Sequence, residues 1–247
     1  MLNIFRAKRQ FQDLEWMHVD MHSHLLPGID DGASSLDDSL HLLEQLQDLG
    51  LRKFFFTPHV FREMYPNTQD TIQEAFQQIA SSASADAVGG FAAEYMVDNY
   101  FDRLLQTQKP LAYLPDHHVL IEMSYMQESA MIEKIIFDLQ MQGYKPILAH
   151  PERYVFYHGK TDRIEHLRNL GCLLQLNLLS LYGYYGSKEK QVARLLCEKG
   201  LIDLVGSDVH HRRHIKAIEH GLTKEDLWPY FKRCRLKNQE LFSETYA

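Results

Sequence analysis

Cysteine is scarce in this chain, and long apolar runs are missing from it. The 247 residues include three cysteines, Cys172, Cys197 and Cys234, which are widely separated. They follow neither the CxxC spacing of a zinc site nor the even pairing of a disulfide framework. We therefore expect reduced thiols, with Cys172 and Cys197 in the core, and a cytoplasmic protein. No run of about 18 apolar residues occurs, so we expect no transmembrane helix.

Positive charge is also in short supply. The chain carries 26 Lys and Arg residues against 33 Asp and Glu residues, which gives a formal net charge of −7. Proteins that bind the phosphates of nucleic acids are usually basic, so a nucleic-acid partner is not expected. No GxGxxG motif follows the first apolar run, which disfavours a dinucleotide-binding fold.

Short apolar runs alternate with longer amphipathic segments along most of the chain. The expected strands are Met17–Met21, Lys53–Thr57, Gly90–Ala93, Val119–Ile121, Pro146–Ala149, Cys172–Leu176 and Leu201–Val205. The expected helices are Leu36–Leu49, Thr68–Ala80, Ser129–Gln142, Thr161–Leu170 and Ser187–Lys199. Gly50, Gly143, Gly171 and Gly200 follow four of these helices, where glycine commonly ends a helix.

This alternation predicts parallel strands joined by right-handed crossovers. About seven such units fit a single-domain, distorted (β/α)7 barrel of the TIM type over residues 17–247, preceded by an N-terminal arm over residues 1–16. We expect this arm to be a frayed terminus rather than a membrane or partner contact. An open, doubly wound sheet is the alternative.

Residues that bind metals follow nearly every expected strand. These residues, in chain order, are His22, His24, Asp30, Asp31, His59, Glu94, Glu122, His150, Glu152, Asp208 and His210. The carboxyl ends of the strands of a parallel barrel meet on one face, where such enzymes place their active sites. The sequence therefore predicts that these side chains converge on one site.

The mixture of imidazole and carboxylate groups indicates which metals would bind. Residues i and i+2 of an extended segment point to the same side, so His22 and His24 can act together, as can Asp208 and His210. Such ligands suit zinc, manganese or iron better than magnesium or calcium. Arg153 follows His150 in the same loop and is suited to hold a phosphate group, unless it pairs with Glu152 instead.

The other histidines lie outside this pattern. We expect solvated side chains at His41, His117, His118, His166, His211, His214 and His220.

Several strings together resemble a known family. Residues 20–33, DMHSHLLPGIDDGA, are similar to the opening of the bacterial capsule-type tyrosine phosphatases, which belong to the PHP (polymerase and histidinol phosphatase) superfamily. The strings Thr57-Pro58-His59, Ala149–Arg153 (AHPER) and Ser207–His210 (SDVH) resemble its later motifs in the same order. The combination is specific and extends over residues 17–240, nearly the whole chain.

The resemblance implies three bound divalent metal ions, commonly manganese. The first would be held by His22, His24, Glu94 and Asp208, and the second by Glu94, Glu122 and His150. The third would be held by Asp31, His59 and His210. Arg153 matches the phosphate-binding arginine of the family. A second such arginine would fall at Ile215, so Arg213, or less favourably Arg212, is the expected substitute.

The resemblance also implies the reaction. We expect hydrolysis of phosphotyrosine on a protein, with the tail of a polysaccharide-export tyrosine kinase as substrate, and with His59 or His210 available as a general acid. Tyr182, Tyr184 and Tyr185, with Leu178, Leu179 and Leu181, are candidates for substrate contact, with packing or a subunit interface as the alternatives. No Cys-x5-Arg loop occurs, which excludes the thiolate mechanism of other tyrosine phosphatases. The competing hypotheses are a small-molecule phosphatase of the histidinol phosphate type, a non-catalytic metal- or partner-binding module, and a PHP exonuclease.

Overall fold

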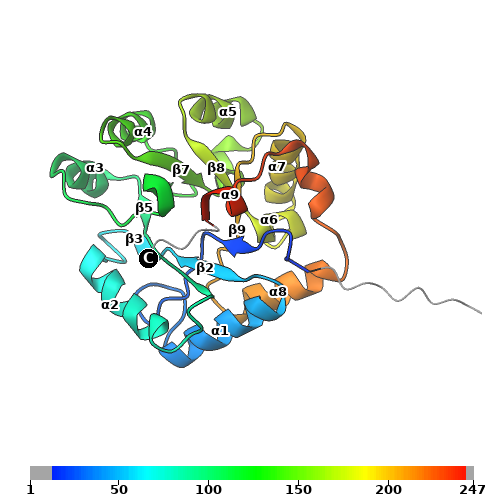
Figure 1. Cartoon of the computed structure of the whole chain (residues 1–247). Coiled ribbons are helices and arrows are strands. Elements are labelled where there is room, and N and C mark those ends of the chain that lie inside the picture. The colour runs from blue at the N-terminus through cyan, green and yellow to red at the C-terminus, as the bar shows by residue number, and fades with distance from the viewer. Residues whose placement is uncertain (1–12, 243–247) are drawn as a thin grey trace, which may run out of the picture.

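A computed structural model describes residues 13–242 of the chain. Parallel strands form its centre, and helices surround them (Figure 1). The strands are β1 Val19–Asp20, β2 Lys53–Phe56, β3 His59–Val60, β4 Val88–Phe91, β5 Glu94–Met96, β6 His118–Glu122, β7 Lys145–Ala149, β8 Leu173–Asn177 and β9 Leu204–Gly206. The α-helices are α1 Leu36–Asp48, α2 Gln69–Ala80, α3 Asn99–Gln106, α4 Ile132–Met141, α5 Thr161–Asn169, α6 Leu178–Tyr182, α7 Ser187–Glu198, α8 Arg212–Leu222 and α9 Asn238–Phe242. No helix within residues 13–242 is long and apolar enough to cross a membrane.

The strands divide into two parallel sheets because the chain breaks after β2 and after β4 and continues in β3 and β5. One sheet has the order β1-β2-β4, and the other has the order β3-β5-β6-β7-β8-β9. The chain passes from the first sheet to the second between β2 and β3, and again between β4 and β5. Counting each interrupted pair as one strand leaves seven strand positions, as the distorted (β/α)7 barrel requires. The predicted fold is confirmed.

Hydrogen bonds just beyond the strand ends join the first strand to the last. The backbone N–H of Asp208 donates to the carbonyl oxygen of His22 (2.8 Å), and that of His24 donates to Val209 (3.0 Å). The buried carboxylate of Asp20 accepts bonds from both the backbone N–H and the hydroxyl of Ser207. These contacts hold the residues that follow β1 against the residues that follow β9.

The helices begin and end where their sequences provide caps. The Ser35 side chain accepts the N–H of Asp38 at the start of α1, and Thr68 and Thr71 form a reciprocal capping box at the start of α2. Beyond α4, α5 and α7, the chain turns at Gly143, Gly171 and Gly200, whose φ values of 84°, 93° and 68° suit glycine. The five expected helices are therefore present, with ends that differ by up to three residues.

The start of the described chain packs against the barrel. Leu14 is fully buried, and its N–H donates to the carbonyl oxygen of Leu49. The Trp16 ring lies 5.2 Å from the Phe231 ring. The frayed terminus expected over residues 1–16 therefore does not extend to Leu14, and residues 1–12 lie outside the described part. Cys172 and Cys197 are buried free thiols, as predicted.

Candidate metal centre and active site

The predicted metal ligands lie together at the carboxyl ends of the strands. His22 and His24 follow β1, Glu122 ends β6, His150 follows β7, and Asp208 and His210 follow β9. His59 and Glu94 are instead the first residues of β3 and β5, and their Cα positions pair across the sheet. Six of the predicted ligands are almost completely buried: His22, His24, Glu94, Glu122, His150 and Asp208.

Glu94 lies at the centre of this group. Its Oε2 lies 3.3 Å from His22 Nε2 and 3.4 Å from His24 Nε2. Its Oε1 lies 3.0 Å from His150 Nε2, and its Oε2 is 3.1 Å from His59 Nδ1. One carboxylate therefore touches four imidazoles, which is suited to bridging cations.

Asp208 and Glu122 extend the group on either side of Glu94. Asp208 Oδ1 lies 3.5 Å from His22 Nε2 and 3.3 Å from His24 Nε2. Glu122 Oε1 lies 2.8 Å from His59 Nδ1. The ring of His59 thus has one nitrogen directed at the buried carboxylates.

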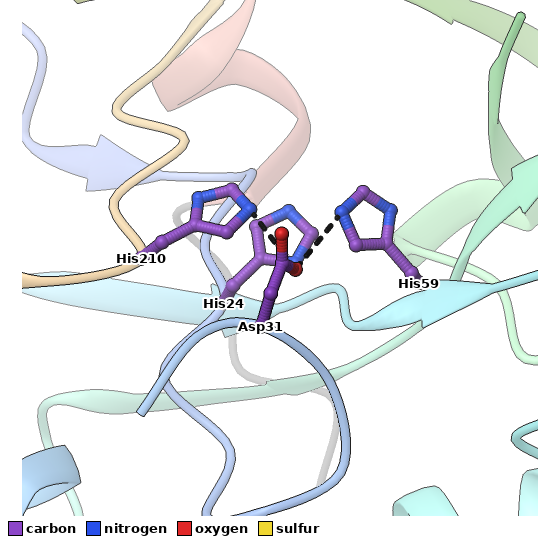
Figure 2. A group of neighbouring side chains, drawn as sticks. All are labelled: His24, Asp31, His59 and His210. Atoms are coloured by element: carbon purple, nitrogen blue, oxygen red, sulfur yellow. Dashed lines mark ion pairs between the residues drawn. The ribbon is translucent and has the colours of Figure 1, made fainter. Parts of the chain in front are cut away.

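Asp31 lies among His24, His59 and His210, and these four residues form the outer part of the group (Figure 2). Its Oδ1 lies 3.5 Å from His59 Nε2 and 3.6 Å from His210 Nε2, and its side chain is 52% exposed. The His24 and His210 rings stack with centroids 3.9 Å apart. This outer set is therefore the part of the cluster that faces solvent.

The contacts within the cluster fit shared cations better than hydrogen bonds. His59 Nδ1 and Glu94 Oε2 are 3.1 Å apart and buried, yet neither atom makes a properly oriented hydrogen bond. His22 Nε2 and His24 Nε2 face each other at 3.2 Å, although neutral imidazoles place lone pairs on such atoms. Ligand atoms within 4.8 Å of one another form four overlapping sets: His24, Asp31, His59 and His210; His22, His150 and Asp208; His22, His24 and Glu94; and His59, Glu94 and Glu122.

Electrostatics support the same interpretation. Although burial opposes ionisation, the neighbouring His22 and His150 hold the pKa of Glu94 well below its usual value. Although burial favours a neutral imidazole, Asp30 and Asp208 raise the pKa of His24 well above its usual value. The carboxylates are thus ionised in a buried place, where negative charge requires cations.

Two ligands occupy strained backbone conformations. The φ angle is 33° at His150 and 51° at Asp208, in the region that non-glycine residues rarely adopt. Each residue directly or almost directly follows a strand, β7 or β9. Such strain typically costs about 1–3 kcal/mol per residue and is concentrated at functional sites. Here it directs both side chains into the cluster.

The second ring nitrogen of three histidines is held by a fixed partner. Asp30 Oδ2 lies 2.8 Å from His24 Nδ1, and Gln175 Oε1 lies 2.9 Å from His22 Nδ1. The carbonyl oxygen of Asp208 lies 2.9 Å from His210 Nδ1. Partners of this kind select the tautomer whose free Nε2 is presented to a metal.

Strand β8 contributes two amides that sequence reasoning did not identify. Gln175 also accepts the backbone N–H of His150, at 3.3 Å. Asn177, two residues on, donates from Nδ2 to Asp208 Oδ2 at 2.6 Å. Glu152 Oε1 accepts from Asn177 N–H and from the Ser180 hydroxyl, so it fixes the β8–α6 turn. The alternation of Gln175 and Asn177 within the apolar string LLQLN is a signal that could have found them.

Arg153 points into the cluster rather than toward Glu152. Its Nη1 donates to Asp208 Oδ2 at 2.8 Å. Its guanidinium lies between the rings of Tyr125 and Tyr185, at 4.4 Å and 4.0 Å from their centroids. The alternative pairing with Glu152 is therefore wrong, and the cation is held beside the predicted ligands.

A cavity of about 490 Å³ opens over the cluster. It is lined by Asp31, His59, Phe61, Met64, Tyr65, Met96, Glu122, Met123, Ser124, Tyr125, Arg153, Tyr185, His210, His211 and His214. The candidate Tyr185 thus lines the cavity. Tyr184 is 42% exposed and lies outside this lining, as does Tyr182, whose ring packs where a Cβ on Gly221 would fall.

The helix that follows β9 departs from expectation. Arg213 is exposed on the first turn of α8 and is not among the lining residues, so the structure gives no support to its expected phosphate contact. Arg212 lies 3.7 Å from Asp38. His211 and His214 line the cavity instead. His214 is buried, so the expectation that it is solvated is wrong, whereas His211 is half-exposed. His118 is also buried, against expectation, at the start of β6.

Comparison with known proteins agrees with this geometry. The chain is 28% identical to the tyrosine-protein phosphatase YwqE of Bacillus subtilis, over 92% of this chain and 94% of the relative. It is 30% identical to the tyrosine-protein phosphatase CpsB of Streptococcus pneumoniae, over 78% and 83%. A crystal structure from work on YwqE and CpsB, described as metal-dependent tyrosine phosphatases, superposes with a TM-score of 0.73 and 24% identity, over 91% of this chain and 94% of that one.

A more distant likeness concerns the fold alone. The lactonase Lmo2620 of Listeria monocytogenes superposes with a TM-score of 0.54 at 10% identity, over 95% of this chain and 97% of that one.

The family model for capsular polysaccharide synthesis, CpsB/CapC, matches residues 18–220. This range contains all the predicted metal ligands together with Arg153. The chain therefore belongs to the CpsB/CapC family of capsular polysaccharide synthesis proteins.

Proposed function

We propose that this chain is a metal-dependent protein-tyrosine phosphatase. The observation that carries the proposal is the convergence of nine imidazole and carboxylate side chains in one cluster, with Arg153 beside it at the base of the cavity. The named phosphatase relatives, YwqE and CpsB, support the same activity. A non-catalytic module would not need a charged arginine held beside such a cluster.

We assign three divalent ions, with manganese preferred, to the ligand sets named from the sequence. Bound divalent cations polarise phosphate oxygens and lower the pKa of water, which provides hydroxide near neutral pH. Asp31 Oδ1 lies 3.5 Å from His59 Nε2 and 3.6 Å from His210 Nε2, so these two imidazoles and this carboxylate can share one cation. We therefore assign His59 and His210 to metal binding before acid catalysis.

Arg153 supplies the fixed positive charge of the reaction. Although burial opposes its charge, contacts with Tyr125 and Asp208 raise its pKa, so the guanidinium remains protonated. Its planar N–H groups can hold two phosphate oxygens and stabilise the charge that they carry in the transition state. Tyrosinate leaves readily because the pKa of tyrosine is about 10, so a strong general acid is not required.

We further propose the biological setting. The family relation to capsular polysaccharide synthesis supports a phosphotyrosine substrate on the tail of a kinase that controls polysaccharide export. The three free thiols favour a reducing compartment, and we place the enzyme in the cytoplasm.

A substrate comparison tests the proposal. A tyrosine-phosphorylated peptide from such a kinase tail and histidinol phosphate should be assayed with the same manganese concentration. We expect the peptide to have the higher kcat/KM. A higher value for histidinol phosphate would replace the proposal with a small-molecule phosphatase.

A further inference from the structure

Methionine is concentrated around the active-site cavity. Met64, Met96 and Met123 line it, and Met126 follows the lining residue Tyr125 directly. These four residues, which we name the methionine wall, are almost half of the nine methionines in the chain. None of them has a part in the metal cluster or in the hold on phosphate.

The methionine wall occupies a separate part of the barrel rim. Met64 follows β3, Met96 ends β5, and Met123 and Met126 follow β6, and these are three neighbouring strands. The lining residues Arg153, Tyr185 and His210 follow the next three strands of the same sheet, β7, β8 and β9. The methionines thus gather on the part of the rim formed by β3, β5 and β6, beside the predicted ligands His59 and Glu122.

Two of these methionines are exposed to solvent. Met64 is 61% exposed and Met126 is 76% exposed, although both are large and apolar. Met64 is held on a closed loop, because Phe61 and Tyr65 exchange two backbone hydrogen bonds. Exposed apolar side chains next to a binding cavity typically mark the contact surface for a ligand.

Continuity with the active site identifies the partner. When a phosphotyrosine side chain is bound beside the metals, the substrate polypeptide that carries it must run out of the cavity on both sides. The residues that flank the phosphotyrosine therefore cross the cavity rim. We propose that Met64 and Met126, the exposed members of the methionine wall, bind apolar side chains that flank the phosphotyrosine of a substrate polypeptide; Met123 is fully buried. This inference rests on the proposed phosphatase function and adds a preference for sequence around the phosphorylated residue.

Methionine suits this task for a physical reason. Its side chain is unbranched and polarisable, so it adapts to apolar partners of different shapes. Surfaces rich in methionine therefore bind many related sequences rather than one. The wall should favour leucine, isoleucine and aromatic neighbours alike, and should disfavour serine and charged neighbours.

The test compares two phosphopeptides with the wild-type enzyme and manganese. They share one phosphotyrosine, which is flanked on both sides by leucines in one peptide and by serines in the other. We expect kcat/KM to be about tenfold higher for the leucine peptide, the size expected from partly burying two apolar side chains. The double variant Met64→Gln, Met126→Gln should reduce this ratio to about one.

A matched variant provides the control. Met141 is 71% exposed at the end of α4, where the chain leads into the amino end of β7 and away from the cavity, so Met141→Gln should keep the wild-type ratio. Two results would overturn this inference and leave the phosphatase proposal intact. One is equal kcat/KM of the wild-type enzyme for the two peptides, and the other is an undiminished leucine-to-serine ratio of kcat/KM in the double variant. Hydrolysis of p-nitrophenyl phosphate without hydrolysis of either peptide would overturn both.

Discussion

Replacing Gln175 with methionine tests how the cluster is held in place. Gln175 is fully buried in β8 and has no position in the proposed ligand sets. Its Oε1 lies 2.9 Å from His22 Nδ1 and accepts the N–H of His150 at 3.3 Å. Methionine has nearly the same length and shape but offers no comparable acceptor, so Gln175→Met removes these bonds without leaving a large cavity.

The expected size of the effect follows from the two buried donors. Each loses its acceptor, at a cost of about 1–3 kcal/mol, so we expect the free energy of unfolding to fall by about 2–6 kcal/mol. His22 also loses the partner that selects its tautomer. Removing such a partner typically lowers metal affinity by about 10- to 100-fold.

Calorimetric titration of manganese into metal-free protein measures this affinity directly. Gln142→Met is the matched control, because Gln142 is exposed just beyond α4 and its amide bonds to Leu105. We expect weaker manganese binding in Gln175→Met alone. Wild-type affinity in a folded Gln175→Met protein would refute the argument that Gln175 orients His22.

Three further substitutions test separate parts of the account. Arg153→Ala should lower kcat/KM for a phosphopeptide by about 100- to 1000-fold while elemental analysis finds normal metal content, and metal loss would make Arg153 structural. Asp208→Ala should lower metal content, because its carboxylate lies 3.5 Å from His22 and 3.3 Å from His24; full occupancy would remove it from the ligand set. Burial raises the pKa of Asp20 from 3.8 to about 6, so its ionisation makes wild-type stability fall as pH rises from about 4 to 6. The free energy of unfolding of Asp20→Asn, relative to that of wild type, should therefore rise by up to about 3 kcal/mol as the pH rises over that range, as measured by denaturant unfolding. A difference in unfolding free energy that does not change with pH would contradict this.

The main elements of the fold could be predicted from local patterns. The helices α1, α2, α4, α5 and α7 have apolar faces and end at glycines or capped turns, which are signals within a few residues. The short strands β3 and β5 were not predicted, because they have only two and three residues and arise where one long strand breaks. Such a break depends on the packing of the whole barrel.

Helix α8 was also missed, although its sequence contains a usable signal. Ile215, Ile218 and Leu222 lie on one face and are buried, but the polar residues around them obscure the pattern. The missed helix explains why His214 was expected to be solvated. Its burial comes from contacts with Tyr184 and His211, which no local pattern reveals.

The metal ligands could be predicted because parallel strands bring their carboxyl ends to one face. The residues that orient those ligands could not be predicted in the same way. Gln175 and Asn177 are neutral amides in an apolar strand. They orient the ligands through hydrogen bonds to residues far away in the chain, His22 and Asp208. Only the assembled barrel places them side by side.

The central claim is that these side chains hold divalent cations without which phosphotyrosine is not hydrolysed. The most direct test is phosphopeptide hydrolysis by protein stripped with a chelator, followed by titration of manganese and elemental analysis at each step. We predict no turnover in the metal-free protein and recovery of activity as manganese binds, with magnesium less effective. Undiminished turnover by protein shown to contain no metal would contradict the account.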